Sequence, residues 1–277
     1  MNRRRDREIY EELIQRLNRP PASPARIPDG LILNIGTFFL GAPYQAGTLE
    51  GKGAERLVVN LRAFDCFTFV ENVVALTRHL ISVKRSFPLF LKFLRKIRYR
   101  QARLRGYPSR LHYFSDWIRD NQKKGILKDI TAELGGRPLK KTMTFMTTHA
   151  DLYPALKIAS NLRAMRAAER TISKRPLSFI PKRELRLCED RIQNGDLIAI
   201  TTDRDGLDVQ HVGFAVKMKN RTHLLHASSV GERVVLSEKT LYRFLMESRT
   251  RSGIMVARLV SSQGSSGRLF HRSGSRP

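Results

Sequence analysis

Cysteine and acidic residues are scarce in this chain of 277 residues. Two cysteines do not make a disulfide framework in a chain this long, and the sequence has no CxxC motif or spaced Cys/His quartet that would build a structural zinc site. No run of about 18 apolar residues is available for a transmembrane helix. We therefore expect neither a metal nor another cofactor. Asp and Glu total 25 against 51 Lys and Arg, which gives a formal charge of +26.

This excess of positive charge favours partners that carry negative charge. Because Lys and Arg occur throughout the sequence, the folded chain must present a broadly cationic surface. Such a surface suits nucleic acid, anionic lipid, or a cell-wall polymer that carries carboxylates and phosphates. Charge alone does not choose among these partners.

Proline and serine mark the ends of one compact region. Residues 5–17 have helical spacing and are followed by RPPASPARIP at 19–28, where the prolines favour an extended linker. The last residues, 261–277, are rich in Ser, Gly and Arg and predict a disordered tail. We therefore divide the chain into an N-terminal helix and linker at 1–30, a single domain at 31–260, and the tail.

Neither the opening of the sequence nor its most apolar run has the usual pattern of a signal peptide. MNRRRDREIYEELIQRL is basic at first and then charged at helical spacing, unlike an uninterrupted apolar signal region. The run LILNIGTFFLG at 31–41 is short and follows the linker. We interpret it as part of the core, with a signal-like role as the alternative.

Helical and β-like patterns occupy separate parts of the domain. Residues 64–170 are rich in helical patterns, whereas 195–260 contain short runs of β-branched and aromatic residues. Three of these runs, NGDLIAITT, HVGFAVKM and THLLHASS, predict an antiparallel meander. Segregated helices and strands predict an α+β fold.

Cys66 is the candidate nucleophile. In FDCFTFVENVVALTRHLISV, apolar residues recur at helical spacing and Asp65 is a suitable N-cap, which predicts a helix that begins at Cys66. Unpaired backbone N–H groups and the helix dipole are expected to lower the pKa of this thiol toward neutrality, although Asp65 opposes the effect. The alternative is that Cys66 is a small buried hydrophobic residue. Cys188 has no comparable setting and is assigned a structural role.

His211 and His226 are the candidate base and its partner, because a nucleophilic cysteine needs an imidazole whose second nitrogen is held by a polar group. His211 opens the run HVGFAV, in which Gly213 lies on the same face and leaves room for another element. If residues 217–220 form a four-residue hairpin loop, His226 lies directly opposite His211 and the two imidazoles touch. His223 then falls on the other face.

Four motifs resemble, in this order, the papain-like, NlpC-type cell-wall peptidases. They are the nucleophile segment FDCFTFVE (64–71), the strand GDLIAI (195–200), the base strand HVGFAV, and the strand LLHAS (224–228). Three other segments resemble a narrower group, the N-acetylmuramoyl-L-alanine amidase-like family: GAPYQAGTLE (41–50), LVVNLRAFDC (57–66) and SRLHYFSDW (109–117). The resemblance extends from about residue 36 to residue 260.

This resemblance implies a fold and a reaction. The expected fold is papain-like, with a helix-borne cysteine packed on an antiparallel sheet or open barrel. The expected enzyme is a cysteine hydrolase that cuts an amide bond of bacterial peptidoglycan, as an N-acetylmuramoyl-L-alanine amidase or a stem-peptide endopeptidase. Cys66, His211 and His226 would form the triad, and Tyr44 would be a substrate or oxyanion contact.

The same resemblance implies partners and a location. Peptidoglycan or a muropeptide is the expected substrate, and anionic wall polymers are further candidate partners. No specific nucleic acid is expected. The implied location is the cell envelope or periplasm.

Two features depart from the superfamily pattern. Phe67 stands where many NlpC-type enzymes have Ser, and about 145 residues separate Cys66 from His211, far more than in minimal members. The extra length predicts a helical insertion at about 80–190, beside the cleft. Within it, an aromatic and polar cluster is a candidate for the substrate pocket: His112, Tyr113, Ser115, Asp116 and Trp117. A helix cap formed by Ser115 or Asp116 is the alternative.

Other functions fit part of the sequence. Basic helices such as KFLRKIRYRQARLRGY at 92–107 suit a nucleic-acid binder, but no zinc finger, RNP-like aromatic motif or obvious helix-turn-helix accompanies them. Papain-like relatives also include lipid acyltransferases, which keep the fold and change the acceptor. A wall-binding module with a blocked triad is a third alternative.

Overall fold

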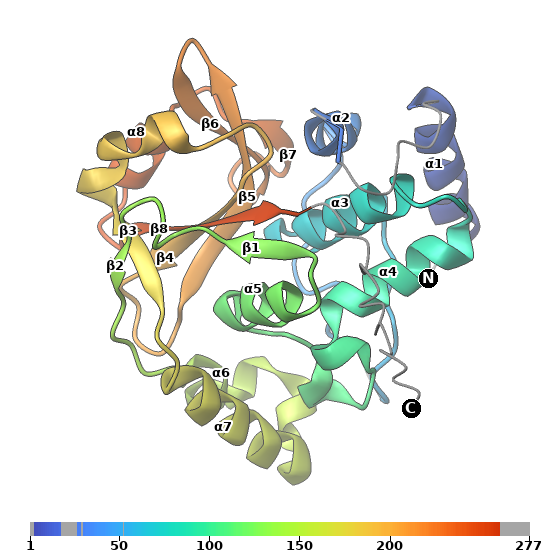
Figure 1. Cartoon of the computed structure of the whole chain (residues 1–277). Coiled ribbons are helices and arrows are strands. Elements are labelled where there is room, and N and C mark those ends of the chain that lie inside the picture. Colours follow the sequence, from blue (N-terminus) through green and yellow to red (C-terminus); the bar gives the residue numbers. More distant parts are fainter. Residues whose placement is uncertain (1–2, 18–26, 29, 52, 261–277) are drawn as a thin grey trace, which may run out of the picture.

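The computed structural model describes residues 3–17, 27–28, 30–51 and 53–260, and it shows one antiparallel sheet with helices on both faces (Figure 1). The sheet has eight strands in the order β2-β3-β8-β4-β5-β6-β7, and β1 pairs with β8 beside this path. All of the strand pairs are antiparallel. The prediction of an α+β fold is confirmed.

The elements follow one another in this order. The helices are α1 (Arg3–Arg16), α2 (Leu31–Phe38), α3 (Cys66–Leu80), α4 (Phe87–Arg98), α5 (Phe114–Lys123), α6 (Phe145–Thr148), α7 (Ala159–Ser173) and α8 (Leu241–Met246). The strands are β1 (Leu127–Asp129), β2 (Arg137–Pro138), β3 (Ser178–Pro181), β4 (Leu197–Thr202), β5 (Val209–Met218), β6 (Arg221–Ser228), β7 (Arg233–Leu236) and β8 (Arg251–Leu259).

Side chains on the central strands point alternately to the two faces of the sheet, and both faces are apolar. On β4, Leu197 and Ala199 point to the side covered by α2, α3 and α4, whereas Ile198 and Ile200 point to the side covered by α8. All four side chains are fully buried. Because helices cover both faces, the sequence of the central strand is a continuous apolar run.

Helix α3 begins at Cys66, as predicted. The Asp65 carboxylate accepts a hydrogen bond from the Thr68 backbone N–H at 2.7 Å, and the Thr68 hydroxyl accepts one from the Asp65 backbone N–H at 3.0 Å. This reciprocal capping box fixes the first turn. Farther along the helix, Phe69 packs edge-on against Phe214 of β5, with ring centroids 6.0 Å apart. The helix therefore holds its first residue close to the sheet.

The apolar run at 31–41 forms α2, and its interpretation as part of the core is confirmed. Ile35 is fully buried. Gly36 lies against Leu225 of β6, where an added Cβ would be 2.7 Å from the leucine Cδ2, so the missing side chain lets α2 approach the sheet closely. In the described part of the chain, no helix combines the length and the apolar character that a membrane span requires.

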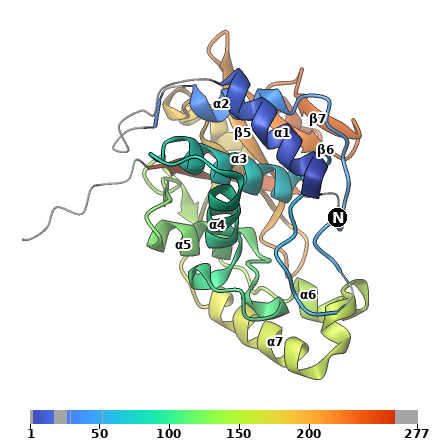
Figure 2. The ribbon, with the colours of Figure 1, turned by 90° about the vertical axis from the view of Figure 1, so that its right-hand side faces the viewer.

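Helix α1 packs on the same core (Figure 2). The Tyr10 hydroxyl lies 2.6 Å from Nε2 of His79 on α3. The buried carboxylate of Asp6 accepts a hydrogen bond from the Leu61 backbone N–H at 2.9 Å. Most of the predicted linker and the whole predicted tail, 261–277, lie outside the described residues.

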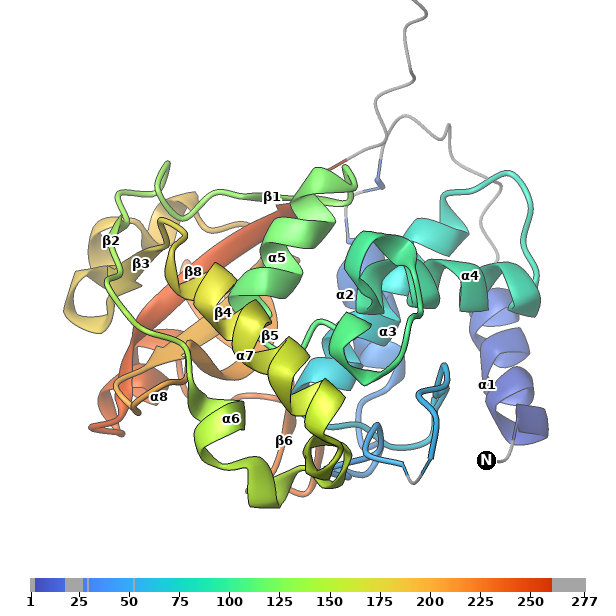
Figure 3. The same cartoon turned by 90° about the horizontal axis from the view of Figure 1, so that it is seen from below.

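The insertion between α3 and β4 is only partly helical, which corrects the prediction of a helical insertion at about 80–190. It contains α4 to α7, but its strands β1 and β3 both pair with β8 and so widen the sheet. Strands of three or four residues are too short to give a clear alternating signal in the sequence. A separate apolar cluster, which includes Tyr113, Met146 and Met165, holds α6 and α7 together at one end of the molecule (Figure 3).

A buried ion pair joins α3 to α4. Arg98 Nε donates to Glu71 Oε2 at 2.6 Å, and only 2% of each side chain is exposed. We predict that Arg98→Met lowers the free energy of unfolding by about 3–5 kcal/mol, because it leaves a buried carboxylate without its partner. Urea denaturation followed by circular dichroism measures this change.

The matched control removes an exposed ion pair. Arg4 contacts Glu8 at 3.3 Å, and 92% of the arginine side chain is exposed. Arg4→Met should change the free energy of unfolding by less than about 1 kcal/mol. Equal losses in the two variants would contradict a special role for the buried pair.

Candidate active site

Two histidines meet on the neighbouring strands β5 and β6. The Nε2 atom of His211 lies 2.7 Å from the Nδ1 atom of His226, and the rings are edge-on with centroids 4.7 Å apart. One nitrogen donates and the other accepts, so His226 holds the ring of His211 in one orientation. The expected contact between the two imidazoles is confirmed.

The register of this hairpin differs from the expected one. Lys219 and Asn220, with φ angles of 46° and 62°, form a two-residue turn in which Met218 pairs with Arg221. The prediction of a four-residue loop at 217–220 is therefore wrong. The true pairing is offset by two residues, and an offset of two returns each side chain to the same face of the sheet. The two imidazoles meet diagonally for this reason.

Gly213 makes room for the diagonal contact. A Cβ atom at this position would lie 2.7 Å from the backbone oxygen of Leu225 and 2.9 Å from the Cβ atom of His226. Both distances are too short for real contacts, so a larger residue would displace β6. His223 lies on the opposite face, as expected, where its Nδ1 atom is 3.0 Å from the Ser237 carbonyl oxygen.

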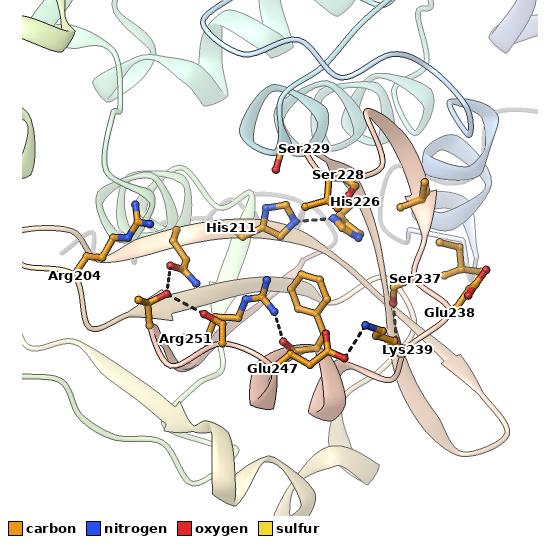
Figure 4. Close-up of a pocket in the computed structure, with 17 residues that line it drawn as sticks. Arg204, His211, His226, Ser228, Ser229, Ser237, Glu238, Lys239, Glu247 and Arg251 are labelled. Atoms are coloured by element: carbon orange, nitrogen blue, oxygen red, sulfur yellow. Dashed lines mark hydrogen bonds and ion pairs between the residues drawn. The ribbon is translucent and has the colours of Figure 1, made fainter.

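The imidazole pair lines a cavity of about 680 Å³ on the α8 side of the sheet, called here the histidine cavity (Figure 4). Phe244 of α8 contacts both rings, with centroids 6.0 Å from His211 and 5.6 Å from His226. Arg251 of β8 lies over the Phe244 ring at 3.8 Å. The rest of the wall is mostly polar and includes Arg204, Gln210, Ser228, Ser229, Ser237, Glu238, Lys239, Glu247, Ser248 and Thr250. A cavity of this size can admit a short peptide.

Cys66 approaches β5 from the side that carries α3. Its sulfur interacts with the backbone N–H of Val212, the residue that follows His211. The side chain is half-buried, and its thiol is free. Among the described residues, neither imidazole forms a hydrogen bond with this thiol. The structure thus brings thiol and imidazole to adjacent positions of one strand without a direct bond between them.

Burial raises the pKa of the Cys66 thiol to about 12, and the neighbouring Asp65 carboxylate adds to the shift. The backbone N–H groups of Val212, Phe67 and Cys66 itself act in the opposite direction, but they do not outweigh burial. The expectation of a thiol pKa near neutrality is therefore wrong. With this pKa, Cys66 is a neutral thiol at physiological pH.

The same burial keeps both imidazoles neutral. It lowers the pKa of His211 to about 3, with further contributions from His226 and Arg251. Burial and Arg251 also lower the pKa of His226 to about 4. A neutral imidazole has a lone pair that accepts a proton, which is the form that a general base requires.

Tyr44 lies close to the thiol. Its backbone pairs with Phe64, two residues before Cys66. Burial raises the pKa of its hydroxyl, and the neighbouring Cys66 and Asp65 add to the shift. A hydroxyl in this position could donate to the oxygen of a substrate carbonyl, and that contact stays a prediction.

A second cavity, of about 330 Å³, lies on the insertion side of Cys66. Asp65 and Phe67 contribute to its wall, as do His112 and Tyr113 from the insertion. The Nε2 atom of His112 lies 3.0 Å from the Tyr107 carbonyl oxygen, and burial lowers the pKa of the imidazole well below its ordinary value. Two residues of the predicted substrate cluster therefore reach a cavity wall.

The other three residues of the predicted substrate cluster are buried and line neither cavity. Ser115, Asp116 and Trp117 are buried and line neither of the two cavities. Trp117 packs edge-on against Phe67 with centroids 6.1 Å apart, so it supports the residue beside Cys66. The prediction that these three side chains contact substrate is therefore corrected. The cap alternative is also wrong, because the N-cap position of α5 is Tyr113 and the carboxylate that accepts a hydrogen bond from the Ser115 backbone N–H, at 2.7 Å, is that of Asp208.

Cys188 lies in the apolar cluster on the α8 side of the sheet. Its sulfur donates to the Leu185 carbonyl at 3.4 Å, and burial raises the pKa of its thiol. This environment is the one expected for a structural cysteine. Within the described ranges, no group of three or more His, Cys, Asp or Glu side chains is placed to hold a metal ion.

Phe244 and Arg251 are the residues of the histidine cavity that sequence reasoning missed. Neither belongs to a motif that carries the resemblance. Arg251 reaches the imidazoles because β8 lies beside β4 in the sheet, although 48 residues separate the end of one strand from the start of the other. The apolar run after Arg251 signals a strand, but it does not reveal the neighbours of that strand.

Comparison with known proteins identifies a family model and several similar solved structures. A family model described as AmiA-like, N-acetylmuramoyl-L-alanine amidase-like, matches residues 34–254. A solved structure of an N-acetylmuramoyl-L-alanine amidase from Bacteroides uniformis ATCC 8492 is 37% identical, with a TM-score of 0.78 over 83% of this chain and 98% of that chain. A Bacteroides fragilis protein proposed to be a xylanase is 39% identical, with a TM-score of 0.77 over 82% of this chain and 99% of that chain.

A more distant structure shows the fold alone. A protein from Legionella pneumophila str. Philadelphia 1 is 24% identical, with a TM-score of 0.64 over 92% of this chain and 93% of that chain. The comparison with curated proteins gave no match. The family model spans most of the sequence, from α2 into β8, and includes Cys66 and both histidines. This chain therefore belongs to the N-acetylmuramoyl-L-alanine amidase-like family.

Proposed function

We propose that the chain is a papain-like, NlpC-type cysteine hydrolase that cleaves an amide bond of bacterial peptidoglycan. In this proposal Cys66 is the nucleophile, His211 is the base, and His226 orients the base. The observation that carries the proposal is the position of the Cys66 sulfur at the backbone of Val212, directly after a histidine whose ring is held by a second histidine. Family membership supports the same assignment.

The reaction proceeds through a thioester. His211 turns toward the sulfur when substrate binds, because catalytic hydrogen bonds often form only in the substrate complex. It takes the thiol proton while the sulfur attacks the carbonyl carbon, and it then gives that proton to the leaving amine. His211 next takes a proton from water, which hydrolyses the thioester, releases a carboxylate and restores the thiol. The Tyr44 hydroxyl donates to the developing oxyanion.

An amide is a better target than a glycosidic bond. Glycan cleavage usually requires two carboxylates on either side of the sugar bond. The histidine cavity has two carboxylates in its wall, but Glu247 is paired with Lys239 at 2.7 Å and Glu238 is exposed. The description of the family and the name of the Bacteroides uniformis relative favour the bond between muramic acid and L-Ala over a bond within the stem peptide. Because peptidoglycan lies in the cell envelope, we propose that location for the protein.

Digestion of purified muropeptides tests both the bond and the nucleophile. The wild-type protein should release stem peptides with a free L-Ala amino group, which mass spectrometry detects. Cys66→Ala should release none because the sulfur is the attacking atom, whereas Cys188→Ala should keep wild-type turnover. Truncated L-Ala-D-Glu products would identify an endopeptidase instead, and new reducing sugar ends would contradict amide cleavage.

Substitution of His211 should lower kcat more than substitution of His226. His211→Ala should lower kcat by about 10²–10⁴-fold, the usual contribution of a general base. His226→Ala should cause a smaller loss because this residue positions the base, and His226→Gln should recover part of it through a retained hydrogen bond. Single-turnover kinetics on one muropeptide measures all three variants, and circular dichroism checks their folding. Negligible losses at both positions would defeat the assignment.

The pH profile should reflect a buried neutral base. Protonation of His211 removes the base, so the loss of kcat/KM falls on the acid side. With the pKa of His211 at about 3 and that of His226 at about 4, kcat/KM should persist below pH 6.5, the ordinary histidine value, and fall only toward pH 4.

The measurement covers only the pH range in which circular dichroism shows a folded protein. This limit is needed because histidines that are neutral in the fold take up protons on unfolding below about pH 6.5, so acid also favours unfolding. An acid limb centred at pH 6.5 or above in folded protein would show that the base is not this buried pair.

A further inference from the structure

Two arginines of the histidine cavity form no ion pair with a carboxylate in the described part of the chain. Several buried or half-buried guanidinium groups pair with carboxylates: Arg98 with Glu71, Arg110 with Glu50, and Arg258 with Asp196. Within the described residues, neither Arg204 nor Arg251 forms an ion pair with a carboxylate of the chain. Both side chains nevertheless line one cavity. The wall of that cavity therefore carries two guanidinium groups that no ion pair with a carboxylate of the described residues holds.

Arg251 is held in place beside the imidazoles. Its Nη1 atom donates to the Phe244 carbonyl, and its guanidinium lies over the Phe244 ring, which also contacts both histidines. These contacts orient the guanidinium without cancelling its charge. Figure 4 shows Arg251 below the imidazole pair and Arg204 at the left-hand end of the same cavity.

Neither carboxylate of this cavity wall forms an ion pair with Arg251 or Arg204, although the charge of Glu247 acts on Arg251 and raises the pKa of its guanidinium. Glu247 forms its ion pair with Lys239 at 2.7 Å. Glu238 is exposed and pairs with neither arginine. An anion that enters the cavity would therefore find Arg251 available for contact.

We propose that Arg251, together with Arg204, forms a subsite that binds a carboxylate of the substrate next to the His211–His226 pair. A planar guanidinium binds a carboxylate through two parallel N–H···O bonds, which fixes orientation as well as position. The ligand is a peptide with a free carboxylate near the amide that is cut, as in the stem peptides of peptidoglycan. The inference rests on the proposed function for its substrate and adds the residue that selects that substrate.

Carboxylate binding would also strengthen the base. The charge of Arg251 helps to lower the pKa of both histidines. A carboxylate bound to the guanidinium offsets much of that charge, so the proton affinity of His211 rises when substrate is in place. The substrate thereby prepares the imidazole to accept the thiol proton.

The test combines one protein variant with one chemical change in the ligand. Isothermal titration calorimetry on the Cys66→Ala protein compares the stem tetrapeptide L-Ala-γ-D-Glu-diaminopimelate-D-Ala with the same peptide after amidation of its carboxylates. For the Cys66→Ala protein we expect amidation to weaken binding by about tenfold or more, because it removes a charge-assisted hydrogen bond. When Arg251→Gln is added, the effect of amidation should fall below about twofold.

Two control variants separate the subsite from general effects. Arg243→Gln removes the same charge from an exposed position on α8 outside the cavity wall, and it should leave the effect of amidation unchanged. Arg251→Lys keeps the charge but loses the paired hydrogen bonds, so it should retain part of the effect. Thermal melting of each variant excludes loss of fold as the cause.

Three results would overturn the subsite. They are an equal effect of amidation with and without Arg251, an equal loss of that effect in Arg243→Gln, and no binding of the tetrapeptide to the Cys66→Ala protein. Because the assay measures binding alone, failure of the wild-type protein to hydrolyse muropeptides would overturn the proposed function and leave the binding result standing.

Discussion

The packing of α3 against β5 is the contact on which the whole site depends. The capping box of Asp65 and Thr68 fixes where the helix begins, and the contact of Phe69 with Phe214 fixes where that beginning lies on the sheet. Together they bring the Cys66 sulfur to the backbone of β5. The insertion reinforces this arrangement through Trp117, which packs against Phe67. The long insertion therefore supports the first turn of α3, where Cys66 lies, and it also forms part of a second cavity wall.

Burial decides the protonation of the site. An exposed helix start would favour a thiolate, but here desolvation outweighs the backbone N–H groups and leaves Cys66 as a thiol. The same desolvation leaves His211 and His226 neutral. An ion pair of thiolate and imidazolium would be costly to hold in such surroundings before substrate arrives. Without substrate, the site therefore holds a thiol and two neutral imidazoles, and not a preformed ion pair.

Local features could be predicted from the sequence, and features set by tertiary structure could not. The start of α3 follows from the cap and the apolar spacing beside Cys66, which are encoded within a few residues. The hairpin register was missed because Lys219 and Asn220 adopt positive φ without a glycine to signal the turn. The histidine contact was still found because the error was two residues, which preserves the face. The pKa of the thiol and the place of Arg251 depend on burial and strand order, which no local pattern records.

The positive charge of the chain, formally +26, has one effect at long range and another at contact distance. Surface Lys and Arg attract polyanions in general from a distance, but salt screens their field beyond about 8 Å, and they do not distinguish one anion from another. Inside the domain, Glu71 and Asp196 form ion pairs with individual arginines, whereas the buried Arg78 donates to backbone carbonyls. Arg251 differs from both groups because it is oriented by Phe244, faces the imidazoles and has no carboxylate partner in the described chain. Long-range attraction can therefore concentrate the substrate near the protein, whereas selection among substrates requires a fixed guanidinium at contact distance.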